Sequence, residues 1–174
     1  GVIGFKPSFG LIDRTGIRTL AETFDTVGIF SRTINDAAFL SSIISRRPSL
    51  FTLNNDINTK TFGVCQTPEW KAADTDSRQV FEKAVNLIDN AGGNVKEITL
   101  PEPFQFLAKA QAIIADFEAA NSAAYELNCH REKISDSYIE RAEAGLSCTE
   151  QQYEEALSIV IRAKTDFAIV MKEI

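Results

Sequence analysis

The chain has 174 residues, of which 44% are hydrophobic and 24% are charged, fractions typical of globular domains. With 18 basic and 24 acidic residues its net charge is −6, which argues against direct nucleic-acid binding, because phosphate neutralisation needs a basic surface. No apolar run approaches the roughly 20 residues that span a bilayer, so we expect no membrane partner. The three widely spaced cysteines form no closed disulfide framework, which favours a reducing, cytoplasmic location.

Both ends of the sequence predict a segment of a longer protein. The chain opens without an initiator methionine or the charged start of a secretory signal. Residues 167–174 keep a helical rhythm, without the Gly, Asn or Pro that usually ends a helix. The alternative is a native C-terminal helix that frays.

The first 32 residues predict two short strands joined by turns. Val2–Phe5 is apolar and is followed by Pro7, which cannot donate to a strand ladder, so we expect a short buried strand. Thr26–Phe30 has the same character, and Asp13–Gly16 between them carries the side chains of a turn.

A helix is predicted to follow. Thr33 and Asp36 have the spacing of an N-terminal capping box, and Pro48 closes the element. Its expected apolar stripe consists of Ile34, Ala37, Ala38, Leu40 and Ile44. Residues 54–58 are polar and predict a surface loop.

Residues 61–101 predict a βαβ unit. Phe62–Cys65 is an apolar strand, and Asp74–Asp76 places negative charge at a helix start. The helix carries an apolar stripe over residues 80–91 and ends at Gly92-Gly93, before a returning strand, Val95–Leu100. This order implies parallel strands and a right-handed crossover, so the fold class is α/β.

The remaining residues predict helices. An alanine-rich pattern indicates one long helix over 106–130, a polar hinge over 131–137 and a looser helix over 138–144. Gly145–Ser147 breaks this pattern, and a capping box at Thr149–Gln152 opens a final helix that we expect to continue to Ile174.

Single residues give little evidence of an active site. His130 is the only histidine, and its polar neighbours favour a surface position over a catalytic base. With three scattered cysteines it also lacks the spacing of a zinc site. Ser41, Ser42 and Ser45 have no base nearby and are interpreted as a polar helix face, and Cys65 as a buried structural thiol.

Two glycine-containing segments could be taken for cofactor-binding loops, but their sequences argue against this function. Gly1–Ser8 superficially resembles a phosphate loop, but Pro7 removes a backbone donor directly after Lys6. Gly92-Gly93 follows a helix, so it is a cap and not a dinucleotide cradle. We expect no cofactor and no metal. Asp25 and Arg32 flank the second strand and could form a structural ion pair.

Three segments together resemble the amidase signature family of serine hydrolases. Gly1–Gly10 (GVIGFKPSFG) is similar to the Gly-Val-x-Gly-(Phe/Leu)-Lys-Pro-(Ser/Thr)-x-Gly stretch that closes the signature region. Asp25–Ala38 is similar to its Asp-x-x-Gly-Pro-x-x-Arg-(Ser/Thr)-x-x-Asp-Ala-Ala run, except that Ile29 replaces the usual proline. The βαβ unit is also similar to the family's sequences, so the resemblance covers about residues 1–101.

The resemblance implies a mixed sheet flanked by helices and a Ser–cis-Ser–Lys mechanism. In the family, the lysine, the bridging serine and the nucleophile precede the Gly-Val-x-Gly stretch, which here begins at Gly1. Lys6 is therefore not the catalytic lysine, and we assign no catalytic residue. We expect 1–174 to be a partial amidase domain: the end of the signature region (1–48), a βαβ unit (61–101) and a helical segment (104–174).

The expected full-length protein is a hydrolase of a small-molecule carboxylic amide, and the 174 residues alone are expected to be inactive. Residues 65–70 look more like a stand-alone amidase than the glutamine-hydrolysing A subunit of a tRNA-dependent amidotransferase, which stays an alternative. A non-catalytic α/β interaction module is the alternative from another class. We also expect exposed apolar surface and a possible homodimer.

Overall fold

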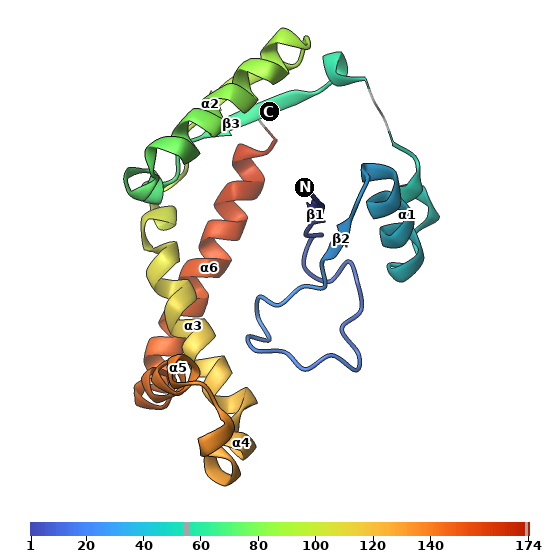
Figure 1. The fold of residues 1–174 in the computed structure, drawn as a ribbon. Helices are drawn as coiled ribbons and strands as arrows, with labels where there is room; N and C mark the ends of the chain where they lie inside the picture. Colours follow the sequence, from blue (N-terminus) through green and yellow to red (C-terminus); the bar gives the residue numbers. More distant parts are fainter. Residues whose placement is uncertain (54–55, 173) are drawn as a thin grey trace. The chain divides into compact units, whose positions relative to one another are not determined.

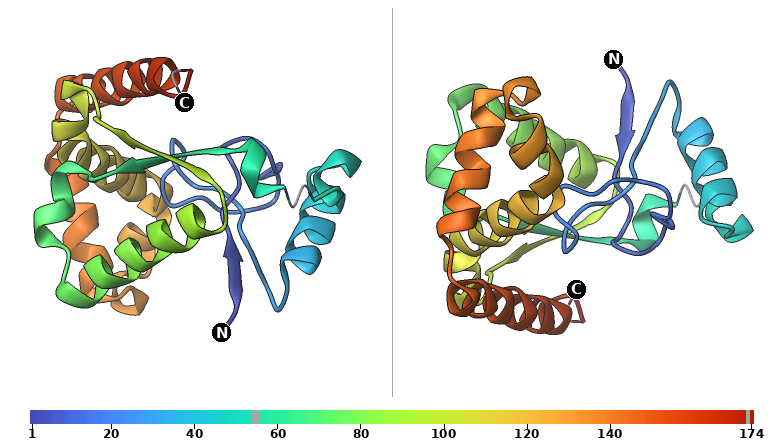
Figure 2. Two further views of the ribbon diagram at one scale, coloured as in Figure 1. Left: turned by 90° about the horizontal axis from the view of Figure 1, so that it is seen from above. Right: turned by 90° about the horizontal axis from the view of Figure 1, so that it is seen from below.

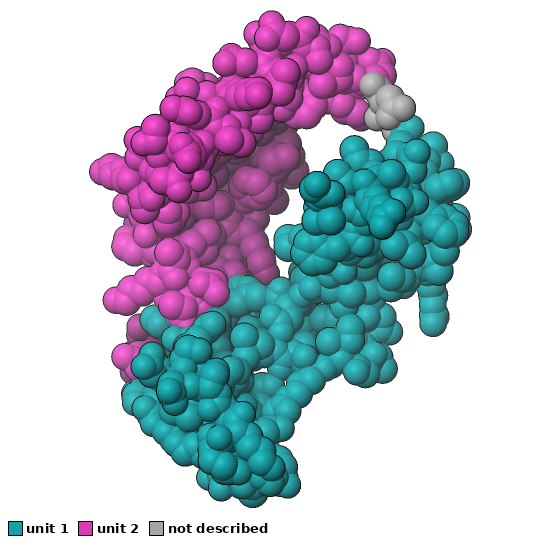
Figure 3. Space-filling model, viewed as in Figure 1, with its two compact units in different colours: residues 1–54, 113–149 teal, residues 55–112, 150–174 magenta. Residues whose placement is uncertain are grey.

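The computed structural model describes residues 1–53, 56–172 and 174. It contains two compact units, each built from two pieces of the chain: residues 1–54 with 113–149, and residues 55–112 with 150–174 (Figure 3). Helices and two small sheets, one antiparallel and one parallel, confirm the α/β class (Figure 1). Of the predicted 54–58 loop, Asn54 and Asn55 lie outside the described residues, and Ile57–Thr59 forms a 3-10 turn.

The first unit contains the antiparallel pair of β1 (Ile3–Phe5) and β2 (Ile29–Ser31), with Gly4 opposite Phe30. Both predicted strands exist, although the second begins three residues later than expected. The prediction that the first strand is buried is wrong. Within the predicted stretch, Val2 is 68% exposed and Phe5 is 39% exposed, and only Ile3 is half-buried.

Helix α1 (Ile34–Ile44) begins as predicted, since the Thr33 hydroxyl oxygen accepts the Asp36 N–H at 3.1 Å. Its expected apolar stripe is wrong at Ile34, Leu40 and Ile44, which are exposed. The buried face instead consists of small residues: Ala37, Ala38, Ser41 and Ser42. Small side chains let this helix lie close to β1 and β2, which it contacts. Pro48 then opens a 3-10 helix, Pro48–Phe51.

The serines of α1 are not the solvated polar face that the sequence predicts. Ser41 and Ser42 are buried, and their hydroxyls donate to the carbonyl oxygens of Ala37 (2.6 Å) and Phe39 (2.7 Å). These bonds to the helix backbone satisfy the hydroxyls, so their burial leaves neither of them unpaired.

The single helix predicted over 106–130 is divided in the structure. A 3-10 turn (Glu102–Phe106) precedes α3 (Leu107–Ser122), and α4 (Ala124–Cys129) follows after a change of backbone angles at Ala123. The periodic alanines persist across this break, so hydrophobic spacing alone could not reveal it. A second 3-10 turn (Arg131–Lys133) leads into α5.

Helix α5 (Asp136–Ser147) is longer at both ends than predicted, and Gly145 is a packing residue instead of a break. A Cβ atom at Gly145 would lie 2.0 Å from the Asp116 carbonyl oxygen of α3. Two further bonds join these helices: Tyr138 Oη donates to the Ala119 carbonyl at 3.0 Å, and Arg141 Nε donates to Asp116 Oδ1 at 2.8 Å.

The second unit contains the predicted βαβ unit. Parallel strands β3 (Thr61–Cys65) and β4 (Asn94–Ile98) are joined through α2 (Thr75–Asn90), which runs along them (Figure 2). The Asp74 carboxylate caps the helix by accepting the Ser77 N–H at 2.7 Å. Gly92 adopts a φ of +88°, confirming the left-handed cap at the other end.

Two aromatic pairs support the second unit. Trp70, in the 3-10 segment Pro68–Ala72, packs on Phe81 of α2 with ring centroids 4.9 Å apart. Phe104 packs on Phe167 of α6 (Glu150–Val170) at 5.9 Å. The final helix therefore exists, but it ends at Val170 and not at Ile174. No helix among the described residues has the length and apolarity needed to cross a membrane.

We predict that Gly145→Ala destabilises the protein by about 1 to 3 kcal/mol, because the added methyl must push α5 away from α3. The free energy of unfolding, measured by urea denaturation, tests this. Leu146→Ala is the matched control on the same helix: Leu146 is 68% exposed, so its loss should change stability little. Equal effects of the two substitutions would contradict the close approach at Gly145.

Candidate functional site

The segment that resembles the amidase signature, Gly1–Gly10, forms β1 and a tight turn. Lys6 Nζ donates to the Pro7 carbonyl oxygen at 2.7 Å, and Pro7 itself is buried. The Leu11 N–H donates to the Ser8 carbonyl at 3.1 Å across a turn in which Gly10 has a φ of +75°. Glycine suits this position because other residues rarely adopt a positive φ. The turn does not open into a helix, so the segment lacks the geometry of a phosphate loop.

Residues 11–25 form neither helix nor strand, and side chains hold them in place. The Arg14 guanidinium donates to the carbonyl oxygens of Glu22 (2.8 Å) and Asp25 (3.1 Å) and pairs with the Glu22 carboxylate at 2.6 Å. It also lies over the Phe9 ring, 4.8 Å from its centroid. Arg14 therefore links both ends of this irregular segment.

Residues 18–23, which we call the docking segment, bind one face of α3 and α4. Glu118 and Ser122 lie four residues apart on one face of α3, and Glu126 follows on α4 just beyond the break at Ala123. Thr23 donates to the Glu118 carboxylate through its N–H (2.8 Å) and its hydroxyl (2.5 Å).

The other two helix residues hold the N-terminal half of the docking segment. The Ser122 hydroxyl donates to the Thr19 carbonyl at 2.5 Å. Both terminal nitrogens of Arg18 donate to the Glu126 carboxylate, and Nη2 also donates to the Ser122 carbonyl at 2.6 Å. The docking segment thus runs antiparallel to the helices, with contacts at each turn.

The Arg18–Glu126 pair has a clear electrostatic signature. Hydrogen bonding from the Arg18 guanidinium lowers the pKa of Glu126 from its ordinary 4.5 to about 2. The same contact raises the pKa of Arg18. Nearby, burial is the main cause that raises the pKa of Tyr138, so this phenol stays protonated at neutral pH.

The residues weighed from sequence do not converge on one site. His130 follows α4, and its ring lies 5.6 Å from that of Tyr125, with no serine hydroxyl or carboxylate bonded to it in the described structure. Cys65 ends β3 and is half-buried, and burial raises the pKa of its thiol, which disfavours the reactive thiolate. All three cysteines are free.

The predicted Asp25–Arg32 ion pair is wrong. Asp25 Oδ2 instead accepts the N–H groups of Leu20 (2.6 Å) and Ala21 (3.2 Å), while Arg32 is exposed and follows β2. The carboxylate therefore caps the turn that carries the docking segment. Within residues 1–53, 56–172 and 174, no three His, Cys, Asp or Glu side chains are grouped as metal ligands.

Sequence reasoning missed Arg14, Arg18 and the three helix residues that hold the docking segment. The four-residue spacing of Glu118, Ser122 and Glu126 is visible in the sequence, but it does not identify their partners. Those partners lie 95 to 108 residues away.

Three comparisons with known proteins agree. The Amidase family model matches residues 1–156. The A subunit of glutamyl-tRNA(Gln) amidotransferase from Clostridium novyi is 27% identical over 100% of this chain, and that from a Cyanothece species is 32% identical over 72%. A crystal structure of an amidase covers 97% of the chain with a TM-score of 0.85 and 25% identity.

The chain spans only part of each of these proteins. It covers 43% of the Clostridium novyi protein, 29% of the Cyanothece protein and 38% of the amidase in the crystal structure. The match is therefore to a region of longer proteins.

We predict that the Glu126 carboxyl titrates with a pKa of about 2 in the folded protein. Since the folded-state pKa is lowered, the bond from Arg18 to ionised Glu126 stabilises the folded protein. This contribution is complete above the ordinary pKa near 4.5 and is lost as the pH falls through about 2. Carbon-detected NMR of the carboxyl resonances measures it. Arg18→Gln should return the Glu126 pKa toward 4.5.

The control is Arg131→Gln, which removes an ion pair with a different carboxylate, Glu143. It should leave the titration of Glu126 unchanged. A low Glu126 pKa that persists in Arg18→Gln would show that the guanidinium is not its cause.

Proposed function

The chain belongs to the Amidase family, and we propose that the protein containing these residues hydrolyses a carboxylic amide through an acyl-enzyme intermediate. The observation that carries the proposal is the family match over residues 1–156, most of the chain. The TM-score of 0.85 with a solved amidase supports it. On this proposal the stretches 1–48, 61–101 and 104–174 are parts of one partial amidase domain.

The proposed chemistry is that of a serine nucleophile, a bridging serine and a neutral lysine. The nucleophile's oxygen attacks the amide carbonyl, the bridging serine relays its proton to the lysine, and backbone N–H groups hold the oxyanion. Water then releases the acid. A lysine can serve as the base when burial disfavours its ammonium form.

We assign none of these roles to residues 1–174. Lys6 follows the position of the nucleophile in the signature, and its ammonium donates to the Pro7 carbonyl. Ser41 and Ser42 donate to carbonyls of their own helix, with no base bonded to them in the described structure. We infer that these residues form scaffold and do not themselves cleave amides.

The second candidate is the glutamine-hydrolysing component of a tRNA-dependent amidotransferase. The names of the Clostridium and Cyanothece relatives favour this assignment. The two candidates differ in substrate and in their need for partners. Simple amides should release ammonia with a stand-alone amidase and no other protein. The amidotransferase component should act on glutamine and depend on its partner subunits.

We predict that the full-length protein releases ammonia from an amide and that the isolated 174-residue chain does not. Coupled ammonia detection with benzamide and with glutamine measures both. Reproducible turnover by the isolated chain would contradict the absence of reacting groups. A folded full-length protein that is inactive on both amides, with and without partner subunits, would favour the non-catalytic interaction module.

We further propose that the isolated chain self-associates, because many large apolar side chains are exposed between residues 30 and 53: Phe30, Ile34, Phe39, Leu40, Ile43, Ile44, Phe51 and Leu53. Light scattering should show a mass above the 19.2 kDa of one chain. Phe39→Glu with Ile43→Glu should reduce association. The control, Val80→Glu with Leu87→Glu on α2, should reduce it less. A wild-type chain that is strictly monomeric would contradict the proposal.

A further inference from the structure

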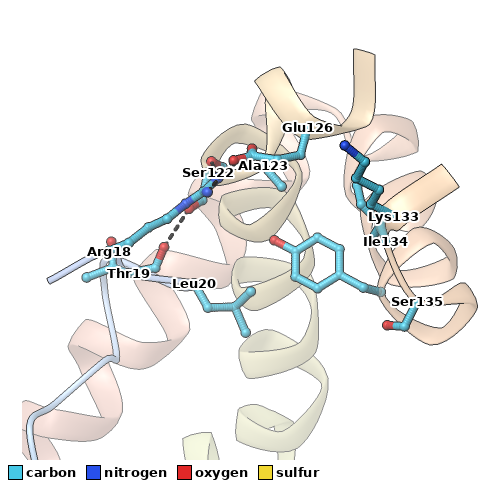
Figure 4. A pocket seen from close by; sticks show the side chains of 10 residues that line it. Arg18, Thr19, Leu20, Ser122, Ala123, Glu126, Lys133, Ile134 and Ser135 are labelled. Atoms are coloured by element: carbon cyan, nitrogen blue, oxygen red, sulfur yellow. Dashed lines mark hydrogen bonds and ion pairs between the residues drawn. The ribbon is translucent and has the colours of Figure 1, made fainter. Parts of the chain in front are cut away.

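The first unit contains a pocket of about 430 Å³ between the docking segment and the polypeptide from α3 to α5 (Figure 4). Leu20 comes from the docking segment, Ala123 from the break between α3 and α4, and Ile134 from the residues before α5. Together with the Tyr138 ring these side chains give the pocket apolar walls.

The charged side chains that line the pocket differ in whether they have an ion-pair partner. Arg18 and Glu126 also line it, but they neutralise each other through paired hydrogen bonds. Lys133, on the wall opposite Arg18 and Leu20 in Figure 4, has neither an ion pair nor a hydrogen bond from its ammonium in the described structure. Among the described lining residues it is the one charge that no neighbouring side chain balances.

The uncharged polar side chains at the pocket also differ in whether their hydroxyl groups are already hydrogen-bonded. The Tyr138 hydroxyl is committed to the Ala119 carbonyl, and the Ser122 hydroxyl to the Thr19 carbonyl. Ser135 has only a long contact, 3.4 Å, with the Ser137 hydroxyl. A ligand therefore meets apolar walls with one free ammonium and one available hydroxyl beside it.

This chemistry selects one ligand class. A cation would be repelled by Lys133 while the Glu126 carboxylate is already used by Arg18. A multiply charged phosphate would find a single free cation. A monocarboxylate with an apolar body pairs its charge with Lys133 and buries the rest against the walls.

We propose that this pocket binds a small monocarboxylic acid with an apolar or aromatic body. The carboxylate lies at Lys133 and Ser135, and the body contacts Leu20, Ala123 and Ile134. The pocket does not need the proposed amide hydrolysis in order to bind, although the ligand class is that of the acid such a reaction releases.

The test is a titration of the full-length protein with benzoate, followed by isothermal calorimetry and by NMR shifts of Leu20 and Ile134. Benzamide is the neutral probe of nearly the same shape. We expect benzoate to shift both residues, and benzamide to bind more weakly by about twofold to fivefold, as loss of one exposed charge pair predicts. Higher salt should weaken benzoate only.

The variant Lys133→Gln should weaken benzoate binding at this pocket by a similar factor of about two to five. Lys83→Gln removes the same charge from an exposed position of α2 and should have no effect. Both side chains are exposed, so both variants should fold, which circular dichroism checks.

Absence of benzoate shifts at Leu20 and Ile134 would overturn the proposal, as would equal affinity in Lys133→Gln and wild type. Binding of benzoate elsewhere on the protein would not move these residues. Failure to hydrolyse amides, in contrast, would remove the proposed function and leave the titration result unaffected.

Discussion

The first unit depends on the row of side chains formed by Glu118, Ser122 and Glu126. A segment without regular structure still has to pair its backbone N–H and C=O groups. In residues 18–23 the Thr23 N–H and the Thr19 carbonyl pair with Glu118 and Ser122, while Asp25 accepts the N–H groups of Leu20 and Ala21. The contacts join parts of the chain that lie 95 to 108 residues apart. They connect the segment that follows the signature-like stretch to the helices, and they form one wall of the pocket.

Small residues determine how the helices of this unit pack. The buried face of α1 is made of alanine and serine, and α5 approaches α3 where Gly145 meets the Asp116 carbonyl. At these contacts the backbones lie close together, and large side chains do not pack between them. The large apolar residues of α1 consequently point outward, and Phe39 and Ile43 are at least 50% exposed. A chain that covers 38% of a solved amidase can fold these elements and still leave much apolar surface uncovered.

Features coded by neighbouring residues could be predicted from the sequence. Thr33 and Asp74 cap their helices as their spacing indicates, Gly92 ends α2, and the parallel βαβ unit is present. Features without a periodic or capping signal could not be predicted, whether they are local or depend on distant contacts. The break at Ala123, the burial of Ser41 and the bonding of Asp25 depend on contacts or backbone angles that hydrophobic periodicity does not report. For the candidate site, the resemblance of sequence motifs was enough to identify the family. The contacts of the docking segment could be found only in the folded structure.

We propose that residues 1–174 support an amidase centre whose reacting groups lie elsewhere in the protein. Labelling of the full-length protein with a fluorophosphonate tests it most directly, because an activated serine displaces fluoride and keeps the phosphonyl group. Peptide mapping by mass spectrometry then locates the modified residue. We predict one modified serine outside these 174 residues. Modification of a serine within them, such as Ser8 or Ser41, would contradict it.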